Sequence, residues 1–475
     1  MRIITVLGLY LATISLSLSL QAATPPNIIL YVTDDQGLET VGIYGGENIA
    51  TPNLDKLATA GAYFTNAFAS ASSCTVSRGN LLSGKHGHVN GLYGHEHLYN
   101  HFSSFSDIKS LPVLLKRANY RTARIGKYHV APESVYKFDK VFPNASPETG
   151  NAYGRSLIEM ADVVMDFATQ DRKQPFFLYM CPNDPHRSSP HLPDKPNNFG
   201  NQPGGYPGVK RVRISAKNAV VPNYLPDIPE VRAELVEFYE SISRIDQGFG
   251  HLMKNLKDAG LYDNTVIIFL SDNGTPMPNA KTTLYDTGIR LPLIVKAPGQ
   301  KAQGAINEAM VSWIDIAPTL LDYAGVDTSD VKFNGKSFRS VLEGGPADDF
   351  GEVYGSHTFH EVTMYYPMRM IRTHNYKLIW NIAHPLEYPT GWHVWEGSVN
   401  AAIRNRNIKY LGKRKTKAYK HRPQFELYDL KKDPLEINNV ADKKAYQETL
   451  EALKTKLFAF QKSTNDPWAI KLKHE

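Results

Sequence analysis

Runs of consecutive apolar residues, many of them β-branched or aromatic, recur along the first two thirds of the chain. Residues 27–32 (NIILYV), 176–180 (FFLYM) and 265–270 (TVIIFL) are three such runs. Continuous apolar runs of this length are typical of strands that are buried on both faces of a parallel sheet. The pattern therefore predicts a central sheet that is covered on both sides.

The segments between these runs repeat apolar residues at helical spacing. Residues 111–118, 157–167 and 235–260 predict helices, and residues 121–125 predict a further strand. Residues 190–229 are dominated by Gly, Pro and Asn, and we expect them to form a long irregular excursion. Because strands alternate with helices, the fold class is α/β with a mostly parallel sheet between helices.

Two shorter elements are expected before Cys74. A helix begins at Thr51-Pro52, with Thr51 at its N-cap and proline in its first turn, and it ends at Gly61. Residues 63–69 predict the strand that leads to Cys74.

The pattern changes after about residue 356. Residues 368–380 and 425–430 predict antiparallel strands, and residues 446–460 predict a closing helix. We therefore expect two structural units, an α/β domain at residues 24–355 and a smaller C-terminal α+β subdomain with an antiparallel sheet at residues 356–475.

Residues 1–23 have the composition of a targeting segment. They contain one arginine, an apolar run and the small residues Ala22-Ala23, which together predict a secretory signal peptide and a periplasmic or secreted protein. No later stretch is long and apolar enough to predict a membrane span. Cys74 and Cys181 are the only cysteines, so we expect no disulfide framework.

Positive charge is concentrated in one place. The formal net charge is +6, but residues 404–422 alone carry nine Lys and Arg and no acid, so the rest of the chain is net negative. Such a run forms either a solvated loop or a surface that binds polyanions such as sulfated glycans or nucleic acid.

The segment around Cys74 combines a thiol with a cation. Residues 72–94 read SSCTVSRGNLLSGKHGHVNGLYG, in which Arg78 follows Cys74 by four positions and a helical turn closes at Gly84. A thiol at a helix N-terminus beside a guanidinium is expected in a positive field, which favours anionic sulfur and anionic ligands. The alternative is a buried packing cysteine followed by a surface arginine.

Polar residues follow nearly every predicted strand. Because ligands of open α/β sheets bind beyond the carboxyl ends of the strands, we expect these residues to share one edge of the sheet; they are Asp34, Asp35, Cys74, Lys127, His129, His186, Asp272 and Asn273. Singly, each has an ordinary explanation as a turn, a helix cap or a surface histidine. The oxygen donors among them suit Ca²⁺ or Mg²⁺ better than zinc or copper. Arg78, Lys127 and Lys281 can balance three carboxylates and a bound anion.

The CTVSR segment and the tract after it resemble the maturation signature of the type I sulfatases, in the alkaline phosphatase superfamily. In that family the cysteine is oxidised to formylglycine, whose hydrated aldehyde is the nucleophile. The family pattern has proline or alanine where this chain has Val76. The resemblance implies a formylglycine-generating maturation enzyme as a partner. It also implies one calcium ion, held by Asp34, Asp35, Asp272, Asn273 and the modified Cys74.

The same resemblance implies roles for the cations and histidines. Arg78 would orient the hydrated aldehyde, and Lys127 the oxygens beside the metal. His129 would assist collapse of the intermediate. His186 and Lys281 would hold the outer sulfate oxygens, and His186 would protonate the leaving atom because imidazole titrates near neutrality.

Further tracts, including FFLYMCPNDPHR, FLSDNG and HEVTMYYPMRMIR, resemble the heparan N-sulfatase (sulfamidase) branch of this family, which removes the N-sulfate of glucosamine. The resemblance implies a sulfated saccharide as substrate, no nucleic acid partner, and substrate-binding roles for His360, Glu361 and Arg369.

Three alternatives stay open at the level of sequence. The first is an O-sulfatase that acts on another sulfated polysaccharide, such as one from algae. The second is a phosphoesterase of the same superfamily, although a serine or threonine nucleophile would then be expected. The third is an inactive, glycan-binding relative in which Val76 blocks maturation.

Overall fold

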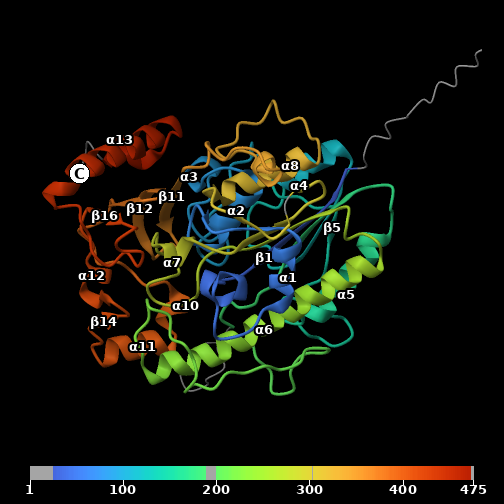
Figure 1. Ribbon diagram of the computed structural model, residues 1–475, viewed down its shortest axis with the longest axis horizontal. Coiled ribbons are helices and arrows are strands. Elements are labelled where there is room, and N and C mark those ends of the chain that lie inside the picture. The colour runs from blue at the N-terminus through green and yellow to red at the C-terminus, as the bar shows by residue number, and fades with distance from the viewer. Residues whose placement is uncertain (1–24, 189–198, 302, 472–475) are drawn as a thin grey trace, which may run out of the picture.

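The computed structural model describes residues 25–188, 199–301 and 303–471, so the predicted signal peptide at residues 1–23 lies outside the described residues. An eight-stranded sheet forms the centre of the molecule (Figure 1). In spatial order its strands are β5 (Lys140–Val141), β4 (Arg121–Gly126), β6 (Phe176–Cys181), β1 (Asn27–Thr33), β7 (Thr265–Ser271), β8 (Leu293–Lys296), β2 (Ala62–Phe64) and β9 (Ala305–Asn307).

Strand direction confirms the predicted mostly parallel sheet. The five strands from β5 to β7 are parallel to one another. Beyond them β8 runs antiparallel to β7 and β2, and β2 is parallel to β9. The carboxyl ends of β4, β6, β1 and β7 therefore meet at one edge of the sheet.

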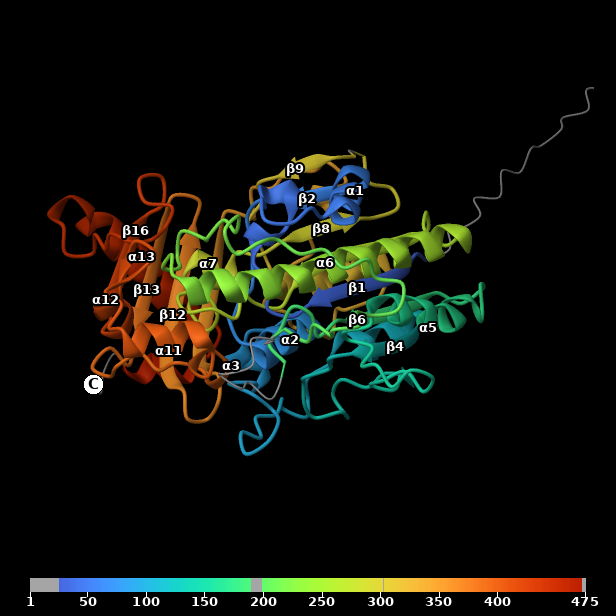
Figure 2. The same cartoon turned by 90° about the horizontal axis from the view of Figure 1, so that it is seen from below.

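Strand β1 shows why the apolar runs are continuous. All seven of its residues are buried. Ile29 and Tyr31 pack into a core with the helices α1 (Pro52–Ala60), α5 (Leu157–Thr169) and α6 (Pro229–Asp258). Ile28, Leu30 and Val32 pack into a second core with α2 (Cys74–Ser83), α4 (Leu111–Leu115) and α8 (Ile316–Tyr323). Both faces of the sheet are thus covered by helices (Figure 1), and Figure 2 shows α5 and α6 lying across one of them.

The remaining elements of this part are short. They are the helices α3 (Gly87–Asn90), α7 (Asp286–Ile289) and α9 (Arg339–Leu342), and the 3₁₀ turns η1 (Leu38–Thr40), η2 (Gly42–Tyr44), η3 (Lys116–Ala118) and η4 (Trp313–Asp315). Residues 199–228, the described part of the predicted excursion, contain no helix or strand.

The predicted strand at residues 63–69 is wrong in its extent. The chain leaves the main sheet after β2, and a separate strand β3 (Ala67–Phe68) pairs with β10 (Val311–Ser312) in a second, two-stranded sheet. The break comes at Thr65 and Asn66. The Thr65 amide donates to the Asn307 carbonyl at 2.9 Å, and the Asn66 side chain donates to the Glu308 carbonyl at 3.1 Å.

Helix α1 begins at the predicted place, but Thr51 does not cap it through its side chain. The Thr51 hydroxyl instead accepts the Gly42 amide at 2.8 Å. Asp246 of α6 caps the helix from a distance in sequence, because its carboxylate accepts the amides of Asn53 and Leu54 at 2.9 and 3.0 Å.

The C-terminal part is built on a four-stranded antiparallel sheet of β11 (Glu352–Phe359), β12 (Tyr365–Thr373), β13 (Tyr376–Asn381) and β16 (Phe425–Asp429). Ile371, Leu378 and Trp380 pack on one face against α13 (Gln447–Ser463). Met368 and Ile379 of the opposite face join the larger core. The predicted antiparallel sheet and closing helix are confirmed, whereas the domain boundary at residue 356 stays a prediction.

Small elements complete the C-terminal part. They are α10 (Trp392–Trp395), α11 (Ser398–Asn405), β14 (Tyr410–Leu411), β15 (Arg414–Lys415), α12 (Thr416–Lys420), η5 (Lys444–Tyr446) and η6 (Pro467–Ile470). Among all described helices, none combines the length and the hydrophobicity that a membrane crossing requires.

Candidate active site

The carboxyl ends of the parallel strands bring the predicted residues together. Asp34 and Asp35 directly follow β1, and Asp272 and Asn273 directly follow β7. Lys127 directly follows β4, whereas Cys74 is the first residue of α2. His129 and His186 lie in the loops after β4 and β6, and Lys281 lies in the loop between β7 and α7.

Asp35 lies at the centre of this cluster. Its backbone has φ +67°, a left-handed conformation that is uncommon for a residue other than glycine. One carboxylate oxygen accepts the Asn273 side-chain amide at 2.6 Å and lies 3.8 Å from the Cys74 sulfur. The other accepts Lys281 at 2.7 Å and lies 3.7 Å from His186 Nε2. Asp35 therefore connects the thiol with a cation, an amide and an imidazole.

Asp34 and Asp272 lie on either side of Arg78. Lys127 donates to Asp34 at 2.6 Å, and the Arg78 guanidinium lies 3.9 Å from the other Asp34 oxygen. Arg78 Nε donates to Asp272 at 2.9 Å. The remaining Asp272 oxygen accepts the backbone amides of Asp35 and Asn273 at 3.0 and 2.8 Å. Three carboxylates and three cations thus lie in one buried cluster.

Burial and neighbouring charges shift the pKa values of the three carboxylates in different directions. Burial alone raises each pKa, but the charges of Lys127 and Arg78 outweigh it at Asp34, whose pKa is held below its usual range. Burial dominates at Asp35, whose pKa is raised despite Lys281. Burial likewise raises the pKa of Asp272 to about 7, although Arg78 opposes it. Asp34 is therefore the carboxylate most firmly held in its charged form.

Part of this cluster fits a hard cation. Ligand atoms of Asp34, Asp35, Cys74 and His186 lie within 4.8 Å of one another. Asp34 Oδ1 and Asn273 Oδ1 are buried and have no hydrogen-bond partner among the described residues, which is costly unless a ligand satisfies them. Such oxygen donors suit Ca²⁺ or Mg²⁺. Asp272 is not part of the 4.8 Å group, and both of its oxygens are occupied by Arg78 and backbone amides.

The expectation of an anionic sulfur is wrong for unmodified Cys74. Its side chain has no exposed surface. Burial raises the pKa of the Cys74 thiol far above its usual range, and the nearby charges of Lys127 and Lys281 only partly oppose this. The sequence could not indicate how completely the thiol is removed from water.

His186 does not titrate near neutrality in this environment. Burial, followed by the charges of Lys127 and Lys281, holds its pKa well below the usual range of an imidazole. Its Nδ1 lies 2.6 Å from the Arg187 carbonyl, which can only accept, so Nδ1 carries the proton. The neutral ring therefore presents the lone pair of Nε2 toward Asp35.

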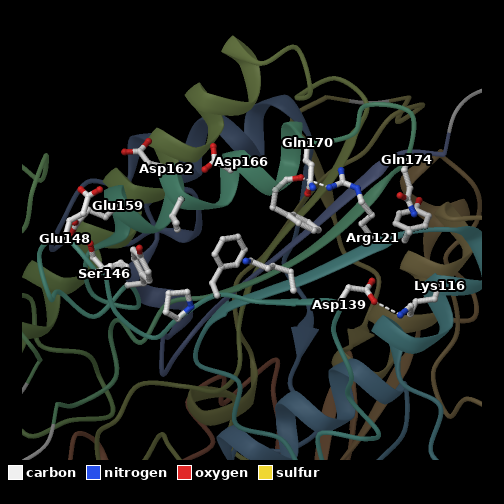
Figure 3. A pocket seen from close by; sticks show the side chains of 18 of the residues that line it. Lys116, Arg121, Asp139, Ser146, Glu148, Glu159, Asp162, Asp166, Gln170 and Gln174 are labelled. Carbon is white, nitrogen blue, oxygen red and sulfur yellow. Dashed lines mark hydrogen bonds and ion pairs between the residues drawn. The ribbon is translucent and has the colours of Figure 1, made fainter.

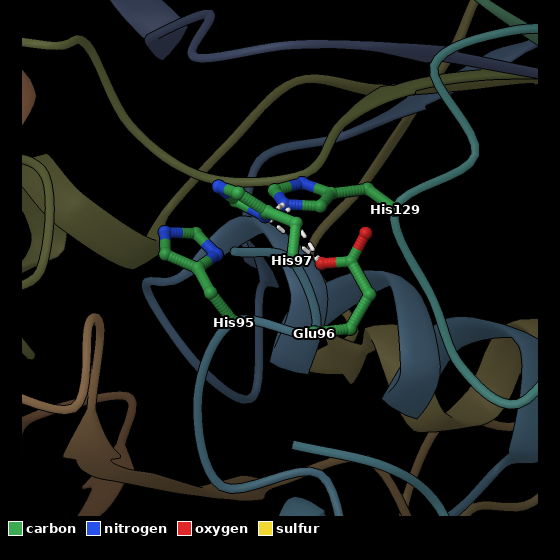
Figure 4. Close-up of side chains that lie close together, drawn as sticks. All are labelled: His95, Glu96, His97 and His129. Carbon is green, nitrogen blue, oxygen red and sulfur yellow. Dashed lines mark hydrogen bonds and ion pairs between the residues drawn. The ribbon is translucent and has the colours of Figure 1, made fainter. Parts of the chain in front are cut away.

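A group of histidines adjoins this cluster (Figure 4). His129 has φ +56°, and its Nε2 lies 2.8 Å from His97 Nδ1 and 3.1 Å from a Glu96 oxygen. That oxygen is also 3.1 Å from His97 Nδ1. His129 Nδ1 is buried without a partner, and burial lowers the His129 pKa to about 3. His129 is therefore neutral, and Glu96 and His97 fix its ring.

His360 connects the histidines with the helix of Cys74. Its Nδ1 lies 2.9 Å from the hydroxyl of Ser73, the residue before Cys74, and its Nε2 lies 3.2 Å from His95 Nε2. The sequence interpretation omitted Ser73, His95, Glu96 and His97. The only available signal was the His-Glu-His triplet directly after the signature tract.

The other two predicted substrate-binding residues make structural contacts. Both oxygens of Glu361, which is 8% exposed, accept the Trp392 amide at 2.9 and 3.2 Å, so Glu361 caps the start of α10. Arg369 is fully buried and pairs with both oxygens of Asp466. Its substrate-binding role stays a prediction, and in this structure its guanidinium donates to Asp466 and to the His357 and Met368 carbonyls.

A large cavity lies away from this cluster. It has a volume of 1360 Å³ and lies where β4 and β5 meet α5 (Figure 3). Its lining includes Lys116, Arg121 and Asp139 on one side and Asp162 and Asp166 on the other. None of the predicted site residues lines it, so cavity size does not identify the reactive cluster in this molecule.

Comparison with known proteins places this geometry in a family. The family model described as Sulfatase matches residues 26–326, and a model described as N-sulphoglucosamine sulphohydrolase, C-terminal, matches residues 279–389. The human protein named N-sulphoglucosamine sulphohydrolase is 37% identical over 95% of this chain and 93% of its own. An ulvan-active sulfatase of Formosa agariphila is 29% identical over 93% of this chain and 81% of its own.

Solved structures agree with the fold. A protein in complex with its substrate D-glucosamine-2-N,6-O-disulfate has a TM-score of 0.67 at 23% identity, with 93% of this chain and 98% of that chain covered. This identity establishes similarity of fold alone. The matched family model and the 37% identical relative go further, and together they show that the chain belongs to the sulfatase family.

Proposed function

We propose that this protein is a formylglycine-dependent sulfatase that removes sulfate from a sulfated sugar, most specifically the N-sulfate of glucosamine. The position of Cys74 carries the proposal. It is fully buried at the start of α2, 3.8 Å from Asp35, within a cluster of three carboxylates and three cations. The similarity to the human N-sulphoglucosamine sulphohydrolase supports the choice of bond.

Charge balance supports a metal ion and a sulfate in the same site. The cluster is formally neutral, because Arg78, Lys127 and Lys281 match Asp34, Asp35 and Asp272. A divalent cation and a sulfate dianion would together leave that balance unchanged. The proposed ligands of one calcium ion are Asp34, Asp35, Asn273 and the modified Cys74. Asp272 is the fifth proposed ligand, and it would bind calcium only with a change in its present contacts to Arg78 and the backbone amides. Bound calcium would supply stabilisation of negative charge during sulfate transfer.

The cations of the cluster would bind the sulfate oxygens. Lys281 and Lys127 each donate to only one carboxylate among the described residues, and an ammonium has three donors. Arg78 keeps one buried nitrogen, Nη2, without a hydrogen-bond partner. These open donors lie around Cys74, where negative charge develops in the transition state.

The neutral histidines would move protons. In sulfamate hydrolysis the S–N bond breaks, and the nitrogen must gain a proton because an amine anion is a poor leaving group. His186 Nε2, which faces Asp35, would take the proton that the attacking hydroxyl group of the modified Cys74 loses and deliver it to that nitrogen. His129 would take up, at its unpartnered Nδ1, the proton that the remaining hydroxyl group of the modified Cys74 gives up as sulfate leaves, and would so assist that release.

The segment with His360 and Glu361 would shape the substrate pocket. His360 contacts Ser73 directly before Cys74, and Glu361 holds the start of α10. We propose that they position the wall against which the sugar binds. Arg369 would support this wall from inside through its ion pair with Asp466.

A panel of substrates tests the proposal. Sulfate release should be measured from N-sulfoglucosamine, from 6-O-sulfated glucosamine and from sulfated algal oligosaccharides, with Cys74→Ala as the matched inactive control. We expect the wild type to release sulfate from N-sulfoglucosamine and Cys74→Ala to release none. Release from an algal O-sulfate but not from N-sulfoglucosamine would support an O-sulfatase instead, which the ulvan-active relative favours.

A phosphoesterase and an inactive glycan-binding protein have separate tests. A phosphoesterase would cleave a phosphate ester faster than any sulfate compound. An inactive glycan-binding relative would carry unmodified cysteine at position 74, because Val76 would block maturation.

The composition of residues 1–23 supports export to the periplasm or outside the cell. The N-terminal sequence of the secreted, mature protein tests this.

A further inference from the structure

A second cavity lies in the C-terminal part, between α11, the β14–β15 hairpin and α12. It has a volume of 610 Å³, and its lining includes Trp395, Arg404, Lys409, Tyr410 and Lys417. Four of these five residues belong to the basic run at residues 404–422. Part of the basic run therefore lines a cavity and does not form a simple solvated loop.

Not all the cations of this run are available. Arg414 and Arg422 are buried, and their guanidinium groups lie 3.7 Å above the Tyr285 ring and 3.5 Å above the Tyr388 ring. Arg406 pairs with Glu230 and Lys420 with Glu387. Among the described residues, five exposed cations of the run have no acidic partner, namely Arg404, Lys409, Lys413, Lys415 and Lys417.

The same cavity offers aromatic and amide groups. Trp395 is 49% exposed and Tyr410 is 50% exposed, so both side chains are accessible to a ligand. The Arg404 guanidinium lies 3.7 Å above the Trp395 ring, so stacking fixes the cation at the cavity wall. Asn400 and Asn407 add amide donors and acceptors. Aromatic faces, amides and cations are the groups that an anionic sugar requires.

Helix α10 connects this cavity with the active site. The ring of His393 lies 4.6 Å from the ring of His186, and Trp395 lies two residues further along the same short helix. Figure 1 shows α10 and α11 side by side near one end of α6. A chain molecule with one end beside His186 could therefore continue along α10 toward the cavity.

Buried polar contacts hold the loop of His186 to the start of α11. Arg187, which follows His186, pairs with Glu234 of α6. Glu234 also accepts the Ser398 hydroxyl at 2.6 Å and the Val399 amide at 3.2 Å, at the start of α11. The loop of His186 and a wall of the cavity are therefore fixed to the same carboxylate.

We propose that this cavity binds anionic sugar units of the same saccharide whose terminal sulfated unit occupies the active site. The proposal rests on the proposed function and adds to it that the substrate is an oligosaccharide or polysaccharide. Sulfate or carboxylate groups of the inner units bind Lys409, Lys415, Lys417 and Arg404. Their sugar rings lie against Tyr410 and Trp395.

Charge reversal with a matched control tests the proposal. The double variant Lys409→Glu/Lys417→Glu changes two cations of the cavity. Lys443→Glu/Lys444→Glu changes the net charge equally at two exposed lysines that do not line it. We expect kcat/KM on an N-sulfated heparan-type hexasaccharide to fall about tenfold in the cavity variant, through KM, and to stay unchanged in the control. Turnover of monomeric N-sulfoglucosamine should stay unchanged in both.

Binding without turnover separates this proposal from the proposed function. In a Cys74→Ala background, the hexasaccharide should bind about tenfold more weakly to the cavity variant than to the control, and added salt should reduce this difference. An equal loss on the monosaccharide, or no loss on the hexasaccharide, would overturn the proposal. So would tighter binding of a single-stranded oligonucleotide of the same charge. Failure of the wild type to release sulfate, with the binding difference intact, would overturn the proposed function alone.

Discussion

Arg78 in α2 and Arg369 in β12 are both fully buried, but their guanidinium groups are used differently. Both Nε and Nη2 of Arg369 donate to the two oxygens of Asp466, and Nη1 donates to the Met368 carbonyl. Arg78 donates to Asp272 through Nε alone, and in the described part of the chain its Nη2 has no hydrogen-bond partner. One arginine is saturated by the protein, and the other is not.

The difference separates structural charge from functional charge. An unpaired buried polar atom costs free energy, and a ligand that pairs with it removes that cost. Near Cys74 the unpaired atoms include a cation donor, Arg78 Nη2, and two oxygen acceptors, Asp34 Oδ1 and Asn273 Oδ1. A site that has both unpaired donors and unpaired acceptors suits an anion and a cation together. Arg369 and Asp466, in contrast, pair with each other.

Removal of the nucleophile should have the largest effect. We expect Cys74→Ala to lower kcat by about 10⁴-fold or more, because the variant cannot form the covalent intermediate. The melting temperature should change little, since the thiol makes only one hydrogen bond to the described residues, a weak one of 3.8 Å to Asp35. Sulfate release and a thermal melt check both statements. Wild-type activity in this variant would contradict the assignment of the site.

Chelation tests the open oxygen atoms. We expect a divalent-cation chelator to abolish sulfate release and to lower the melting temperature, because a ligand that binds the native state stabilises it. Added calcium should restore both properties. Active protein that contains zinc in stoichiometric amount, or no metal, would show that the open oxygens serve another purpose.

Matched substitutions compare the two arginines directly. Arg78→Lys should lower kcat/KM by about 10² to 10³-fold, the usual effect of losing one donor to a developing anion, with a smaller loss of stability. Arg369→Lys should destabilise the fold by about 1 to 3 kcal/mol, because Asp466 loses a paired donor, and should leave kcat unchanged. Kinetics and denaturant unfolding of both variants are needed. If the two variants lost activity and stability to the same extent, the distinction between the two arginines would be contradicted.

The smallest effect concerns Asp466 and pH. Its pKa is held below its usual range, because the hydrogen bonds and charge of Arg369 outweigh burial. A depressed native pKa stabilises the fold above the unfolded value of about 3.9, and that stability is lost as pH falls through the native pKa. The difference in unfolding free energy between wild type and Asp466→Asn should therefore be constant near neutrality and shrink below about pH 4. A difference that does not change with pH would contradict the ionised pair.

The fold was largely predictable from the sequence because the central strands are buried on both faces. In β1 and β7 the apolar run, its length and the polar residues after it are all local features. The division of residues 63–69 between two sheets was not predictable, because it depends on pairing with residues far along the chain. Thr51 occupies the predicted N-cap position of α1, but the side chain that caps the helix was not predictable for the same reason, since Asp246 lies in α6.

The site was predictable in its members more than in their chemistry. The sequence could place Asp34, Asp35 and Asn273 because they follow β1 and β7, which lie side by side in the sheet. The protonation of Cys74 and His186 could not be inferred, because it is set by burial among residues from several elements. Glu96 and His97 escaped notice because they lie in a loop without periodic pattern.

The sharpest test of the proposed nucleophile is the mass of the peptide that contains Cys74, measured on protein whose sulfate release has been assayed. Formylglycine is lighter than cysteine. We expect the lighter form in active protein, with a fraction that rises in proportion to specific activity across preparations. Full sulfatase activity in protein whose Cys74 is entirely unmodified would contradict a formylglycine nucleophile.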